Sequence, residues 1–287
     1  MGTLIALKYP TNLFGRLADH TYVECGSGAV GWSCWGGKSG GTSFRSGTAS
    51  TKRANSIAQP DEKANIKCYL INGVCHQAAN RILLPAQVTV RGARGYSVSQ
   101  AMFTTYGRPG FWPCHSPFMR YPSVSGDMPE CVTPESSIDN APSDRDRLDW
   151  QFLRREIEIY NSAVDLFTHE PDTEASVNYQ LLCFANMVDW QLGPMLNRAT
   201  IRRLLNIRLK TERRRLSLEQ AYRGENMKGL QFAEHFDELT LDFQDDVANA
   251  TTREEYAALF ELERDERVTL ADPQIVQRQF GVGEIAQ

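Results

Sequence analysis

The sequence contains no CxxC pair, no apolar run of about 18 residues, and no basic segment followed by an apolar one at its N-terminus. Without closely spaced cysteine pairs a structural zinc site has little support, and we expect neither a metal nor a cofactor. Without a long apolar run we expect no membrane-spanning helix. Without a signal-like N-terminus we expect a cytoplasmic protein, or one exported without a cleaved signal peptide.

Seven cysteines are present, and six of them lie before residue 132. An odd number of cysteines without a secretory signal favours reduced thiols over a disulfide framework. A reduced thiol becomes a nucleophile only where its surroundings favour the thiolate. The functional question is therefore which of these cysteines has such surroundings.

Charge and proline content divide the chain. Residues 1–140 carry 13 basic and 8 acidic residues, a net charge of +5, whereas residues 141–287 carry 18 and 27, a net charge of −9. Seven prolines between residues 107 and 143 exclude regular structure there and indicate a long loop or linker. We therefore predict two domains, residues 1–135 and residues 136–287, with different surfaces.

The first domain has the pattern of a small antiparallel sheet. Residues 20–25 are rich in β-branched and aromatic types and predict a strand, and residues 30–35 predict the strand that returns beside it. Residues 5–7 predict a short edge strand, and residues 87–91 alternate like a further strand. Residues 97–106 contain features of both a helix and a strand.

The second domain has the apolar spacing of about four to six packed helices, so the expected fold class is α+β. The helical segments include residues 177–192, 201–218, 229–247 and 253–264. Residues 271–287 are expected to form a tail.

One stretch of the first domain carries a candidate nucleophile. Asn72-Gly73 is a turn signal, and the apolar spacing after it predicts a helix over residues 75–84 that stops before Pro85. Cys75 then lies in the first helical turn, where free backbone N–H groups and the helix dipole favour a thiolate. The same N–H groups are suited to an oxyanion formed when the thiolate attacks a carbonyl. A buried, inert cysteine at a helix start is the competing interpretation.

A nucleophilic cysteine needs a base, and two of the five histidines are candidates. His76 follows Cys75 directly, and neighbouring side chains on a helix diverge by about 100°, so we expect it to point away. His20 opens the predicted strand 20–25, and His115 lies in a proline-flanked loop. The strand position favours His20, and His115 remains the alternative.

The order of these features resembles a known family. His20, Tyr22 and Val23 on a strand, then a glycine-bounded hairpin, then Gly-Val-Cys at a helix start are similar to the circularly permuted branch of the papain-like NlpC superfamily. Its relatives include lecithin–retinol acyltransferase-like proteins. The resemblance covers residues 18–90, and it implies a papain-like antiparallel sheet with a cysteine-bearing helix. The asparagine that directly precedes the family's cysteine is displaced here to Asn72, and Val74 stands in its place.

With Cys75 as nucleophile and His20 as base, the expected activity is that of a cysteine-dependent amidase or peptidase acting through an acyl-enzyme. Peptides, peptidoglycan or acyl groups are the expected substrates, and the resemblance includes secreted bacterial effectors. No residue is assigned to orient the imidazole, because Glu24 lies about 13 Å along the strand from His20.

Three alternatives remain open. One is an acyltransferase of the same fold. Another is a catalytically inactive interaction protein, favoured by the missing orienting residue and the seven scattered cysteines, with the helical domain as the part that binds a protein partner. The third is nucleic-acid binding through the seven basic residues between Arg202 and Arg215. Leucines and isoleucine share that helix and the half is acidic overall, so a solvated or inter-helix face is the better interpretation.

Overall fold

The computed structural model describes residues 2–10, 17–25, 29–32, 39–52, 54–55, 58, 69–108, 151–159, 162, 174–193 and 196–280. Its strands are β1 (Gly2–Tyr9), β2 (His20–Cys25), β3 (Ala29–Trp32) and β4 (Thr42–Ala49). Its named helices are α2 (Cys75–Leu83), the short η2 (Leu84–Ala86), α3 (Tyr96–Phe103), α5 (Glu174–Leu192), α6 (Arg198–Arg223), α7 (Gly229–Ala250), α8 (Arg253–Phe260) and α9 (Pro273–Phe280).

The four strands form one antiparallel sheet in the order β3-β2-β1-β4. Leu4, Ala6 and Val23 are buried on the face that packs against α2, because alternate residues of a strand share a face. The predicted strand 20–25 is confirmed. The edge position predicted for residues 5–7 is wrong, since β1 pairs with strands on both sides; β4, which the sequence pattern did not indicate, covers its second edge.

The helix predicted over residues 75–84 is confirmed as α2, which passes into η2 at Pro85. The strand predicted over residues 87–91 is wrong. Gln87 has a positive φ of 57°, and the Val90 N–H donates to the Asn80 side chain at 2.8 Å instead of to a strand. The ambiguous stretch 97–106 is helical as far as Phe103.

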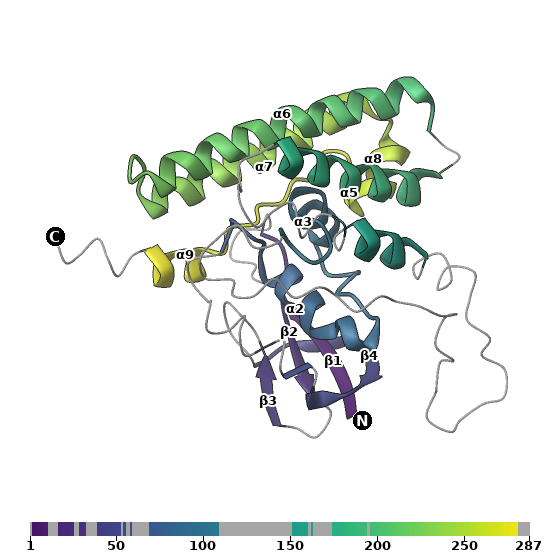
Figure 1. The fold of residues 1–287 in the computed structure, drawn as a ribbon, viewed down its shortest axis with the longest axis vertical. Helices are drawn as coiled ribbons and strands as arrows, with labels where there is room; N and C mark the ends of the chain where they lie inside the picture. The colour runs from purple at the N-terminus through teal and green to yellow at the C-terminus, as the bar shows by residue number, and fades with distance from the viewer. Residues whose placement is uncertain are drawn as a thin grey trace.

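The described residues of the second half are mostly helical, and α6 and α7 run side by side at the end of the molecule away from the sheet (Figure 1). The tail predicted from residue 271 is wrong within the described part of that segment. Residues 273–280 form α9, and Ile275 and Val276 are buried in the same core cluster as the phenylalanines of α7. The apolar pair makes this segment part of the fold.

The predicted domain boundary falls between residues 108 and 151, outside the described residues. One core cluster nevertheless contains Val74 and Phe103 from before it and Phe184 and Phe236 from after it. Phe103 and Phe236 stack with their ring centroids 5.4 Å apart. The described parts of both predicted domains therefore bury apolar surface against each other, with α2 and α3 between the sheet and the α6–α7 pair (Figure 1).

The α+β class with a small antiparallel sheet is confirmed. Among the described helices, none combines the length and apolar character that crossing a bilayer requires.

Candidate functional site

The start of α2 is set by residues on either side of Cys75. The Leu70 N–H donates to the Gly73 carbonyl at 3.0 Å, which closes the turn before the helix. The Gln77 side-chain oxygen accepts the Val74 N–H at 3.0 Å and so caps the first turn. A Cβ atom at Gly73 would lie 2.7 Å from Gln77 Cβ, so glycine is needed there for close approach. Cys75 is thereby the first helical residue.

A row of polar side chains on α2 holds the loop after α3. Gln77, Asn80 and Arg81 are buried, and they donate to three successive carbonyls, those of residues 104, 105 and 106, at 3.1, 2.8 and 2.7 Å. The spacing i, i+3 and i+4 puts the three donors on one helix face. The same spacing of polar residues is a signal in the sequence, separate from the apolar spacing that predicted the helix.

The thiol of Cys75 is buried, with 8% of the residue exposed. It donates to the Asp19 carbonyl at an S–O distance of 3.8 Å. Burial raises the pKa of the thiol to about 12, and it outweighs the opposing effects of the Thr21 backbone, the Thr21 hydroxyl and the His76 backbone, each of which lowers the pKa. The sulfur is therefore a neutral thiol at rest, surrounded by three groups that favour a negative charge on it.

His76 is also buried, and both of its ring nitrogens are engaged. Nε2 lies 2.9 Å from the Asp19 carbonyl, and Nδ1 lies 2.8 Å from the Ser99 hydroxyl. Because a carbonyl only accepts, Nε2 carries the proton. Burial lowers the pKa of His76 to about 4 despite the nearby Asp19. Cys75 and His76 thus converge on one carbonyl, although we expected the histidine to point away.

His20 is 1% exposed and lies directly opposite Tyr9 in the β1–β2 register. The centroid of its ring lies 4.8 Å from that of the Tyr9 ring and 6.5 Å from that of the Tyr22 ring, on which it stacks. Since neighbouring strand residues point to opposite faces, Thr21 is on the face that meets Cys75 and His20 is on the other. The His20–Cys75 pair stays a prediction, and the alternative base His115 lies outside the described residues.

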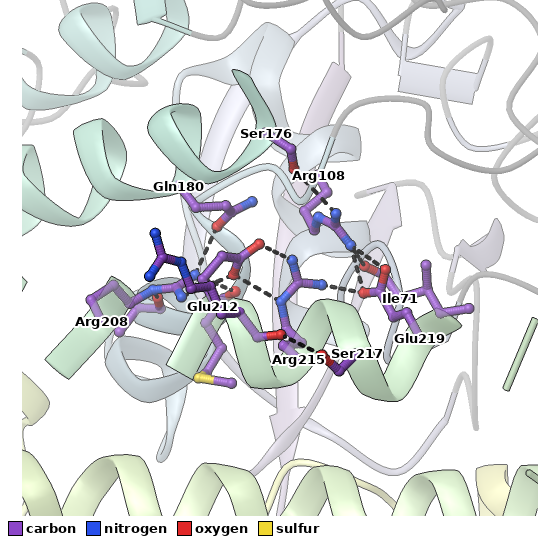
Figure 2. Close-up of polar contacts among 12 residues, drawn as sticks. Ile71, Arg108, Ser176, Gln180, Arg208, Glu212, Arg215, Ser217 and Glu219 are labelled. Atoms are coloured by element: carbon purple, nitrogen blue, oxygen red, sulfur yellow. Dashed lines mark hydrogen bonds and ion pairs between the residues drawn. The ribbon is translucent and has the colours of Figure 1, made fainter. Parts of the chain in front are cut away.

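A second polar cluster, the arginine–glutamate network, lies where α6 packs against the residues after α3 (Figure 2). Its five charged members are all buried: Arg108, Arg208, Glu212, Arg215 and Glu219. Arg208 donates to the carbonyls of residues 101 and 102 at 2.8 and 3.1 Å, and Arg108 donates to Glu219 at 2.8 Å. The network therefore ties α6 to α3 and to the loop that follows it.

The Glu212 carboxylate of this network stays ionised in spite of its burial. Burial by itself would raise the pKa of Glu212, but Arg215 and Arg208 outweigh it and lower that pKa to about 2. Arg215 also pairs with Glu219, one turn further along α6. Two of the seven basic residues between 202 and 215 thus form an inter-helix face, whereas Arg213 and Arg214 are exposed.

In the described residues, no group of three or more His, Cys, Asp or Glu side chains is arranged to hold a metal ion. No family model, no curated protein and no solved structure matches the chain.

Proposed function

We propose that the chain is a cysteine-dependent hydrolase acting on an amide or ester carbonyl, with Cys75 as the nucleophile. The observation that carries this proposal is the position of Cys75 as the first residue of α2, where the backbone groups of Thr21 and His76 oppose the rise of the thiol pKa. N–H groups at a helix start are suited to a thiolate and to a neighbouring oxyanion. An acyltransferase differs only in the group that accepts the acyl chain.

The proposed reaction has two steps. In the first, the thiol proton moves to a base as the sulfur bonds to the carbonyl carbon, and the leaving amine or alcohol departs with a proton. In the second, water or another nucleophile attacks the thioester and frees Cys75. His20 stays the proposed base because of its place on the strand that packs against α2, although its side chain is on the face of β2 away from Cys75, and the His20→Ala comparison tests it. The orienting group stays unassigned.

The test uses the purified full chain with p-nitrophenyl butyrate as ester and an alanyl-aminomethylcoumarin amide. We expect Cys75→Ala to lower any turnover at least about 100-fold. The matched control is Cys25→Ala, at a half-buried cysteine of β2, which should stay within about twofold of the parent. A butyryl adduct on the peptide that contains Cys75, detected by mass spectrometry, would identify the acyl-enzyme. Turnover that survives in Cys75→Ala would overturn the assignment.

His20 has its own comparison. His20→Ala should lower kcat by about 100-fold or more, and the pH profile of kcat/KM should lose its lower limb. Tyr9→Phe keeps the neighbouring ring and serves as the control. An unchanged pH profile in His20→Ala would exclude His20 and leave His115 as the base to test.

A second candidate, a non-catalytic interaction protein, is favoured by one observation: the resting thiol and His76 are both neutral and both bonded to the Asp19 carbonyl. This arrangement is that of a packed polar core. Absence of both turnover and acyl adduct on Cys75 across ester and amide probes would favour this candidate over the enzyme.

A further inference from the structure

The segment that joins α8 to α9 crosses the molecule close to the Cys75 site. We call residues 268–272 the C-terminal strap; Figure 1 shows this part of the chain running from α8 towards α9, between the α6–α7 pair and α2. Val268, Leu270 and Ala271 are buried in the large core cluster. The strap is therefore packed into the protein although it belongs to no helix or strand.

One attachment of the strap lies beside β2. Thr269 forms a parallel bridge with Leu17, and its carbonyl accepts the Ala18 N–H at 3.1 Å. The next residue, Asp19, supplies the carbonyl that receives both the Cys75 thiol and the His76 ring. Just before the strap, Glu266 pairs with Arg94, whose own N–H donates to the Asp19 carboxylate. The strap thus adjoins the segment that positions the sulfur.

A second attachment lies on the turn that leads into α2. The Tyr69 hydroxyl donates to the Leu270 carbonyl at 3.1 Å and accepts the Asp272 N–H at 2.8 Å. From the other side, the Asp237 carboxylate of α7 accepts the Leu270 and Ala271 N–H groups, each at 3.0 Å. These hydrogen bonds hold the strap against the Cys75 turn and against α7, while the Asp272 carboxylate also accepts the Gln274 N–H at the start of α9 at 2.8 Å.

The two attachments lie on the two segments that enclose the thiol, so the strap bridges them. Burial is the largest cause of the raised thiol pKa, and the Asp272 carboxylate is close enough to raise it further. Removing the strap would take away both this negative charge and part of the packing over Val74 and Tyr69, which share its core cluster. Both changes favour a thiolate.

We propose that the C-terminal strap holds the Cys75 site closed, and that its release from Tyr69 and Asp237 opens the thiol to reagents and substrates. The strap covers the site whether or not the protein is an enzyme. That this cover inhibits activity rests on the proposed function. Opening the strap exposes Val268, Leu270 and Ala271 and breaks its hydrogen bonds, and such a local opening costs less free energy than unfolding the whole helical core.

The test measures iodoacetamide labelling of Cys75 in the full chain at pH 8. Tyr69→Phe combined with Asp237→Asn weakens the strap attachments and keeps the side-chain shapes. We expect Cys75 to be labelled at least about tenfold faster than in the parent, because the thiolate fraction rises tenfold for each unit by which its pKa falls. Cys183, a buried residue of α5, should be labelled at the same rate as in the parent.

Tyr256→Phe is the matched control variant. It also removes a phenol that binds a carbonyl of the C-terminal segment, that of Glu266, but it leaves the Tyr69 and Asp237 attachments in place. Its Cys75 labelling should stay within about twofold of the parent. If the double variant releases the strap amides to hydrogen exchange while Cys75 labelling is unchanged, the proposal is wrong.

The parent protein provides a test that needs no variant. With increasing urea, labelling of Cys75 should follow hydrogen exchange at the Ala271 and Asp272 amides and should precede labelling of Cys183. If Cys75 and Cys183 become reactive together, only global unfolding exposes the site and the strap does not control it. Faster labelling without turnover would support the strap and count against the proposed function. Turnover with unchanged labelling would support the proposed function and count against the strap.

Discussion

The Cys75 site and the arginine–glutamate network are both polar clusters buried to a similar degree, yet burial affects their charges in opposite ways. At the first, the pKa of Cys75 is raised to about 12 and that of His76 is lowered to about 4, so both groups are neutral. In the second, Glu212 is ionised between Arg208 and Arg215, and its pKa is lowered to about 2.

The difference comes from the partners. Cys75 and His76 share one backbone carbonyl, that of Asp19. A carbonyl accepts hydrogen bonds, but it carries no full charge that could offset the cost of burying an ionised group. Glu212 meets two guanidinium groups, each within a turn of it on α6. A buried group keeps its charge only when an opposite charge is buried with it. The neutral site is consequently the one whose ionisation a local opening can change.

The largest expected effect comes from removing one charge of the network. Glu212→Gln keeps the shape of the side chain but leaves Arg208 and Arg215 buried without their shared carboxylate. We expect a loss of about 3–5 kcal/mol in the free energy of unfolding, measured by urea titration. Asp242→Asn, which breaks the exposed pair with Arg214, should cost less than about 1 kcal/mol. Equal losses would contradict the contrast between buried and exposed pairs.

An intermediate effect is expected at Gly107, which lies between the two clusters. It has a φ of +86°, and a Cβ there would lie 2.3 Å from the Asn72 carbonyl on the Cys75 turn. Gly107→Ala should lower the free energy of unfolding by about 2–4 kcal/mol, because backbone strain adds to a clash that backbone atoms cannot relieve. Gly92→Ala, at a φ of +93° with no atom within 4 Å, should cost only about 1 kcal/mol. Similar losses in both variants would show that the contact at Asn72 is unimportant.

The third effect is a pH dependence, which is the smallest of the three for each pH unit. An unfolded His76 takes up a proton near pH 6.5 and the folded ring does so only near pH 4, so the folded state binds fewer protons between these values. Its contribution to stability is therefore complete above pH 6.5 and falls by up to about 1.4 kcal/mol per pH unit as the pH drops towards 4.

His76→Gln keeps a donor for the Asp19 carbonyl and removes the titration, so its unfolding free energy should fall less between pH 6.5 and 4.5 than that of the parent. The comparison with the parent also cancels the opposite contribution of Glu156 and Asp237, whose carboxyl pKa values burial raises to about 7. His235→Gln, at an exposed ring on α7, is the control. Identical slopes in His76→Gln and the parent would contradict a buried, neutral His76.

Local sequence signals were enough to predict several elements. The Asn72-Gly73 turn, the apolar spacing after it and Pro85 together placed α2 within one residue, because a helix start and stop depend on neighbouring residues. The β-branched stretch of β2 and the long apolar periodicity of α5, α6 and α7 were predictable for the same reason. The strand predicted over residues 87–91 failed because Asn80, ten residues away in the chain, takes its backbone hydrogen bond.

By itself, the sequence determined which residue begins α2 and therefore which thiol lies at a helix N-terminus, since capping and turn formation act over a few residues. Only the tertiary structure decided the surroundings of that thiol: Asp19 and Thr21 at the start of β2, and the Asp272 carboxylate of a strap from nearly 200 residues further along the chain. Ionisation depends on burial and on the charges within a few ångströms in space, and neither quantity is encoded in the spacing of residues along the chain.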